Sequence, residues 1–103
     1  MSNKVYTLDE IVKVINTLVK NNYPQIKKIL LFGSYARGEQ SYFSDIDLYV
    51  SDSPDFVRLK TIGFASALKE KLNKDIDLFI EKNVDKQSSF YNNIIKDGVV
   101  IYG

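Results

Sequence analysis

The sequence predicts an α/β fold with a small β-sheet, formed by residues 1–103 as a single domain. Helical and strand-like hydrophobic patterns alternate along the chain in the order α, β, short α, β, α, β, α, β. A length of 103 residues is near the usual size of one domain. With 45% hydrophobic and 13% aromatic residues, the chain can bury a core of its own.

The first predicted helix follows Thr7. The segment from Thr7 to Glu10 has the pattern of a capping box, in which the Glu10 side chain bonds back to the amide of Thr7. Apolar residues then recur at helical spacing, namely Ile11, Val14, Ile15, Leu18 and Val19. Pro24 disfavours helical geometry at the residue before it, so we expect the helix to end within 21–24.

Three strands are predicted in the middle of the chain. Ile29–Phe32 is a short apolar run that ends at Gly33-Ser34, as a buried strand would. Asp45–Val50 and Asp75–Ile80 alternate acidic and apolar residues, which is typical of a strand with one packed face. Both contain the string Asp-Ile-Asp-Leu, which we interpret as two strands with similar demands rather than as a repeat. Between the first two strands, residues 34–40 are expected to form a turn with at most one helical turn.

Two further helices and a short strand complete the prediction. The apolar positions of Asp55–Leu72 fit a helix that Gly63 interrupts only softly. Asn83–Asp97 has a last helical pattern, closed by Gly98, a usual cap residue at the C-terminal end of a helix. Val99–Tyr102 is expected to add a strand.

The composition excludes several kinds of chemistry. The chain has no cysteine and no histidine, which excludes disulfides, Cys nucleophiles, Ser-His-Asp catalysis and imidazole or thiolate metal sites. A net charge of +1 argues against direct binding of nucleic acid, because phosphate neutralisation supplies most non-specific affinity. No signal core or membrane-length apolar window is present, so we expect a cytoplasmic protein with no membrane association.

Asp45 and Asp47 are the first candidate site residues. On a strand they point to the same face, with Cα atoms about 6.5–7 Å apart. Two such anions repel each other unless a cation lies between them, and Mg²⁺ prefers oxygen ligands of this kind. A bare Asp-x-Asp pair is more often a solvated strand face, so the metal interpretation depends on the surrounding residues.

Two neighbouring features favour the metal interpretation. The buried strand leads into Gly33 and Ser34, whose backbone could approach a phosphate, and Arg37 adds a guanidinium. The alternative is an ordinary turn with Ser34 as a helix cap. Asp77 lies between apolar residues of a strand, where an unpaired carboxylate is costly. Asp75 shares its face, and periodicity does not decide which of the two points into the site.

Several other residues are given structural roles at this point. Lys27, Lys28 and Lys74 precede strands and are expected to be solvated. Tyr42-Phe43 is the one aromatic pair in a loop that we regard as a possible contact for a nucleotide base or a partner protein.

Taken together, these motifs resemble the minimal nucleotidyltransferase (MNT) domains of the DNA polymerase beta-like superfamily. The resemblance is carried by Gly33-Ser34, ten intervening residues, Asp45-Ile46-Asp47, and an apolar-flanked aspartate about thirty residues later. The strings at 31–38, 44–48 and 94–102 fit the same pattern. The resemblance implies a small mixed β-sheet flanked by helices, with ATP as substrate and Mg²⁺ as cofactor.

The resemblance also implies roles for single residues. Asp45 and Asp47 match the metal-binding pair of the family, and Asp77 is a better match than Asp75 to its third, catalytic carboxylate. Gly33 and Ser34 match the phosphate-binding dipeptide. Arg37 is expected to anchor the triphosphate or the loop.

The expected reaction is a transfer of AMP from ATP to a hydroxyl group, with one or two Mg²⁺ ions at the three aspartates and Asp77 accepting the proton. Single-domain MNT proteins are commonly antitoxins of all-helical HEPN toxins, so we expect a HEPN partner, modified on tyrosine, within a homo- or hetero-oligomer. Three alternatives stay open, of which a polynucleotide-extending role is the least favoured, given the near-neutral charge. The chain could neutralise a toxin by contact alone, or it could be the catalytic subunit of a small-molecule nucleotidyltransferase with a helical partner.

Overall fold

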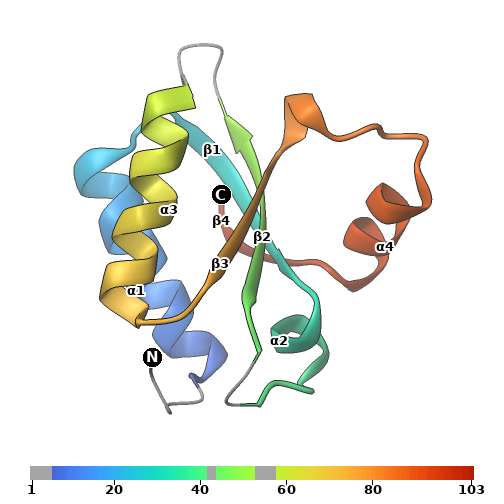
Figure 1. Cartoon of the computed structure of the whole chain (residues 1–103), viewed down its shortest axis with the longest axis horizontal. Helices are drawn as coiled ribbons and strands as arrows, with labels where there is room; N and C mark the ends of the chain where they lie inside the picture. Colours follow the sequence, from blue (N-terminus) through green and yellow to red (C-terminus); the bar gives the residue numbers. More distant parts are fainter. Residues whose placement is uncertain (1–5, 42–43, 53–57) are drawn as a thin grey trace.

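The computed structural model describes residues 6–41, 44–52 and 58–103 (Figure 1). The predicted order of helices and strands is confirmed there, with one added 3₁₀ helix, η1. The elements are α1 (Leu8–Asn22), β1 (Ile26–Phe32), α2 (Ser34–Arg37), β2 (Ile46–Asp52), α3 (Arg58–Leu72), β3 (Ile76–Ile80), η1 (Glu81–Asn83), α4 (Ser89–Asp97) and β4 (Val99–Tyr102). The predicted helix start at Asp55 and the Tyr42-Phe43 pair lie outside the described residues.

The four strands form one mixed sheet in the order β3-β2-β1-β4. β1 pairs antiparallel with both β2 and β4, whereas β2 and β3 are parallel. A parallel pair needs a crossover connection, and α3 lies in the chain between β2 and β3. The mixed sheet flanked by helices that the resemblance implied is therefore confirmed.

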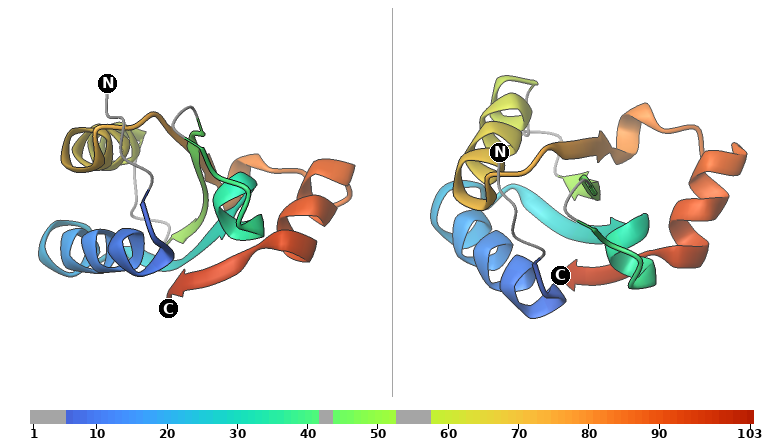
Figure 2. Two further views of the ribbon diagram at one scale, coloured as in Figure 1. Left: turned by 90° about the horizontal axis from the view of Figure 1, so that it is seen from below. Right: turned by 60° about the horizontal axis from the view of Figure 1, so that its bottom comes forward.

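Helices cover both faces of the sheet. α1 and α3 pack on one face, whereas α2 and α4 lie on the other side (Figures 1 and 2). The main core lies under α1 and α3 and includes Ile15, Leu48 and Phe64, all fully buried. A smaller cluster of Leu30, Phe32, Tyr49 and Ile94 lies on the α4 face. The strands thus have apolar residues on the first face and leave part of the second face for polar side chains.

Local hydrogen bonds explain where two helices begin. At α1 the predicted capping box is confirmed, because the Glu10 N–H donates to Thr7 Oγ1 over 3.2 Å and the Thr7 N–H donates to Glu10 Oε1 over 3.0 Å. The predicted start of the last helix at Asn83 is wrong. Ser88 caps α4 by accepting a 3.1 Å hydrogen bond from the Tyr91 N–H, so the helix begins six residues later than predicted.

The strand boundaries shift by a few residues. β1 begins at Ile26, three residues before the predicted start, and the added Lys27 and Lys28 are exposed, as predicted. β2 begins at Ile46 rather than Asp45 and continues to Asp52. Within the described ranges, no helix has the length and apolar character needed to cross a bilayer.

Candidate active site

Three side chains form a row across the sheet on the face that carries α4. The strand pairing sets Asp47 of β2 opposite Asp77 of β3 on one side and opposite Phe32 of β1 on the other. The next residues on the same face are Phe79 and Tyr49, which are also paired. The sheet register thus brings the carboxylates of Asp47 and Asp77 together, and we call this pair the carboxylate row. Aromatic rings lie beside it.

Burial and the neighbouring carboxylates together raise the pKa values of Asp47 and Asp45. Partial burial, a hydrogen bond to Asp77 and the charges of Asp77 and Asp45 raise the pKa of Asp47 to about 6. The pKa of Asp45 is also raised, first by burial and then by the charges of Asp77 and Asp75. The neighbouring carboxylates make the site negatively charged, and a bound cation would stabilise their ionised forms.

Asp75 and Asp77 have different surroundings, although the periodicity of the sequence did not separate them. Asp77 lies beside Asp47 in the register of the sheet. Asp75 forms an ion pair with Lys69 of α3, with 3.0 Å between Nζ and Oδ1. Its main-chain oxygen accepts a hydrogen bond from the Ile46 N–H. In this geometry, Asp77 is the aspartate of β3 that lies closest to the predicted site.

A divalent cation fits this donor set as an open site. In the described part of the chain, no three acidic residues are close enough to enclose an ion on their own. Mg²⁺ usually takes one or two carboxylates and completes its shell with water and substrate phosphates. The Asp47–Asp77 pair, with Asp45 near it, offers hard oxygen donors. The pKa values of Asp47 and Asp45 are raised, and a bound cation would lower them again.

Gly33 is required where it stands. Its φ of +76° is in the region that favours glycine, and a Cβ atom added there would lie 2.1 Å from Asp47 Oδ2. The Gly33 carbonyl accepts hydrogen bonds from the N–H groups of Ala36 and Arg37, which starts α2. The Ser34 side chain makes no cap, because Gly33 is the residue at the N-cap position. The bend between β1 and α2 therefore lies directly against the Asp47 carboxylate.

Arg37 is held by two acidic residues. Its Nε donates to Glu39 Oε1 over 3.1 Å, and one terminal nitrogen donates to Asp97 Oδ2 of α4 over 3.5 Å. The guanidinium also lowers the pKa of Asp47, against the larger effects that raise it. Arg37 thus links α2 to α4 and lies within electrostatic range of the carboxylate row.

Lys74 is a residue that our sequence reasoning placed wrongly. It was predicted to be solvated, but it is 3% exposed. Its charge lowers the pKa of Asp45. A signal was present, since Lys74 has the same parity as Ile76, Leu78 and Ile80, whose side chains face the main core or its edge.

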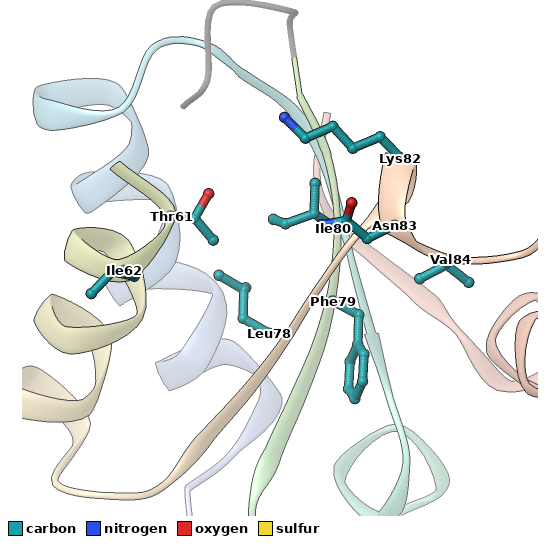
Figure 3. A pocket seen from close by; sticks show the side chains of 8 residues that line it. All are labelled: Thr61, Ile62, Leu78, Phe79, Ile80, Lys82, Asn83 and Val84. Carbon is teal, nitrogen blue, oxygen red and sulfur yellow. The ribbon is translucent and has the colours of Figure 1, made fainter. Parts of the chain in front are cut away.

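A groove of about 570 Å³ lies away from these carboxylates. It runs between α3 and β3 and continues to η1, with Ile62, Leu78, Ile80 and Lys82 among its lining residues (Figure 3). Among the residues that the structure describes, no acidic side chain lines it. The groove therefore does not coincide with the site that the register assembles.

Comparison with known proteins gives a consistent set of matches. Residues 13–103 match the sequence model of the polymerase beta nucleotidyltransferase family. A protein of Methanocaldococcus jannaschii, provisionally named protein adenylyltransferase MJ1215, is 37% identical over 89 residues, which cover 82% of this chain and 100% of that protein. Protein adenylyltransferase MntA of Shewanella oneidensis is 36% identical over 61 residues, or 59% of this chain and 44% of MntA.

A solved structure agrees with these relatives. A chain in a crystal structure of a toxin–antitoxin pair with AMP-PNP aligns with a TM-score of 0.77 at 27% identity. The alignment covers 89% of this chain and 73% of the other. Similarity in sequence and in fold thus extends over most of the described residues.

Proposed function

Because this chain belongs to the polymerase beta nucleotidyltransferase family, we propose that it transfers AMP from ATP to a hydroxyl group of a partner protein. The observation that carries the proposal is the pairing of Asp47 with Asp77 beside Gly33. Phosphoryl-type transfer needs charge stabilisation and positioning more than it needs a histidine or a thiol, and this chain has neither of those groups. The carboxylate row offers oxygen ligands for a divalent cation, which is the kind of metal site that a chain without histidine and cysteine can form.

Asp45, Asp47 and Asp77 are the residues that would hold Mg²⁺. When bound there, the ion would neutralise charge on the triphosphate and lower the pKa of the acceptor hydroxyl. Of the three carboxyls, Asp47 is the one that the sheet holds between neighbours on both sides. Its position is therefore the most firmly fixed.

The other site residues position the triphosphate. Gly33 and Ser34 would offer backbone and hydroxyl donors to the phosphates, at the point where the chain bends against Asp47. Arg37 anchors α2 to α4 in the described geometry, which holds that bend in place. The acceptor oxygen bonds to the α-phosphorus while the bond to pyrophosphate breaks, and the hydroxyl proton passes to the Asp77 carboxylate.

The acceptor that we propose is a tyrosine of a HEPN-type toxin, which would make this chain an antitoxin. Three findings support it: the resemblance to MNT domains, the relatives named protein adenylyltransferases, and the fold shared with a chain of a toxin–antitoxin pair. The near-neutral charge agrees with a protein acceptor better than with a nucleic acid.

The first test uses labelled ATP, Mg²⁺ and the protein encoded by the neighbouring gene. Asp45→Asn, Asp47→Asn and Asp77→Asn should each lower the transfer rate about 10²–10³-fold, since each removes a carboxylate that would hold the ion, and the positive charge of that ion would stabilise the transition state. Asp75→Asn is the matched control, because Asp75 pairs with Lys69 and lies outside the Asp47–Asp77 row. It should keep most of the activity.

The result also separates this function from toxin binding alone. Label on a tyrosine of the neighbour, lost in the three variants, supports the proposal. Unlabelled neighbour that is still neutralised by an Asp45→Asn/Asp47→Asn double variant would contradict transfer and favour neutralisation by contact.

A further inference from the structure

A cluster of three phenylalanine rings lies next to the carboxylate row. The ring centroids of Phe32, Phe79 and Phe90 are 4.9–5.9 Å apart in pairs, in tilted or edge-to-face arrangements. Such distances are typical of rings that pack against one another. The cluster joins β1, β3 and α4 on the same face as Asp47 and Asp77.

The rings are placed by the register that places the carboxylates. Phe32 is the pairing partner of Asp47 across β1 and β2. Phe79 follows Asp77 by two residues on the same face of β3, which sets their Cα atoms about 7 Å apart. Figure 3 shows the Phe79 ring directed away from Leu78. The phenylalanine rings therefore lie directly next to the carboxylates on the same face of the sheet.

Exposure increases across the cluster. Phe32 is 9% exposed and belongs to the smaller core, whereas Phe90 is 40% exposed. Ser88 caps α4 two residues before Phe90, so the exposed ring stands on a fixed first turn of the helix. A buried ring therefore supports an aromatic surface that is open to ligands.

We propose that Phe79 and Phe90 form the surface against which the base of the nucleoside triphosphate stacks. The inference rests on the proposed function, because it assumes that the phosphates lie at Gly33 and the carboxylate row. The ribose separates the base from the α-phosphate by a few bonds, which suits the one-step offset along β3 from Asp77 to Phe79. No other group of three contacting rings lies on this face in the described ranges.

Stacking on phenylalanine has a specific chemical consequence. A ring of this kind offers a π-face and no hydrogen-bond donor or acceptor, so it recognises any base by area rather than by its edge. Purine triphosphates should therefore bind more tightly than pyrimidine triphosphates. Adenine and guanine should differ little through these two rings.

The test compares two probes, Mg-ATP and Mg-tripolyphosphate, by isothermal titration calorimetry of the full chain. Phe90→Ala should weaken binding of ATP about tenfold or more, because stacking on one aromatic side chain contributes about this much. Binding of tripolyphosphate should not change, since it has no base. Phe90→Tyr should restore ATP affinity. Ile95→Ala is the control, because Ile95 is another exposed apolar residue of α4, at 52% exposed.

Four outcomes would overturn the inference. Phe90→Ala could lower the affinity of both probes equally, or of neither, while the wild-type chain binds ATP and transfers AMP; the proposed function would then stand without this surface. Weaker capture of the partner protein with unchanged ATP affinity would assign the rings to a protein interface instead. A wild-type chain that binds neither probe would overturn both proposals.

Discussion

Gly33 lies beside the carboxylate row, with no space for a side chain between its backbone and Asp47. Gly33→Ala adds a Cβ that would lie 2.1 Å from Asp47 Oδ2, at a φ of +76° that disfavours alanine. Displacing a reacting group by about 1 Å can cost about 10²-fold in rate. We therefore expect Gly33→Ala to lower the rate of AMP transfer about 100-fold, as measured with labelled ATP.

Gly38 provides the control for that substitution. Its φ is +72°, yet a Cβ there would meet no atom within 4 Å. Gly38→Ala has a similar backbone strain without the clash, so it should lose stability but keep most of its activity. Equal losses of activity in both variants would contradict a specific role for the space beside Asp47.

The residue scale also shows where sequence reasoning was sufficient and where it was not. Period-two alternation, which is a local property, predicts that Asp45 and Asp47 share one face of their strand and that Asp75 and Asp77 share one face of theirs. The partner of Asp47 across the sheet is not local, because it depends on which strands pair and in which register. Lys74 was misplaced since we assumed that a lysine is exposed, although the same alternation extended back from Ile76 predicts the core side.

At the scale of elements, the capping box of α1 can be separated from the site. α1 packs on the face opposite to the carboxylate row (Figure 2). Thr7→Ala removes the hydroxyl that accepts from the Glu10 N–H and should lower the free energy of unfolding by about 1 kcal/mol. Urea denaturation measures this loss, and the rate of AMP transfer should be unchanged under conditions where the variant is folded.

Thr17→Ala is the matched substitution in the same helix. The Thr17 hydroxyl donates to the Lys13 carbonyl in the middle of α1, which does not satisfy a helix terminus. Alanine has a higher helix propensity, so this variant should be as stable as the wild type or slightly more stable. A Thr17→Ala loss as large as that of Thr7→Ala would contradict the assignment of the effect to the cap.

The elements were predictable where their signals are local. The capping box fixed the start of α1, and apolar alternation fixed the middle of β2 and β3. The predicted start of α4 was wrong because we extended the helical pattern of Phe90, Ile94 and Ile95 back through 83–88, where Val84 is the one apolar residue. The Ser88 side chain begins the helix by accepting a hydrogen bond from the Tyr91 amide. The order of strands in the sheet was not predicted, since pairing between distant segments has no local signature, and the resemblance implied only that the sheet is mixed.

At the scale of the whole molecule, the carboxylate row makes stability depend on pH. The pKa of Asp47 is about 6 in the folded protein against an ordinary 3.8. A raised carboxyl pKa means that the folded state binds the proton more tightly between these values, so stability falls as pH rises from about 4 to 6 and stays lower above that range.

Asp47→Asn should therefore stabilise the metal-free protein. At pH 7.5 with EDTA, we expect a gain of about 1 kcal/mol after allowance for solvent screening, and no gain near pH 4. Thermal unfolding of both proteins at the two pH values measures this. Added Mg²⁺ should raise the Tm of the wild type only. A variant less stable than wild type at pH 7.5 would show that Asp47 is not under repulsion.

The last three residues of the two Asp-Ile-Asp-Leu copies pair with one another in the parallel ladder of β2 and β3, with Asp47 opposite Asp77. A register shift of one residue in either strand would place its aspartates against the hydrophobic core and its aliphatic side chains in solvent. The same strand register is therefore required for the geometry of the active site and for burial of the hydrophobic core. Misassembled molecules would lose stability together with activity, so the cell would not accumulate a folded but defective form through this error.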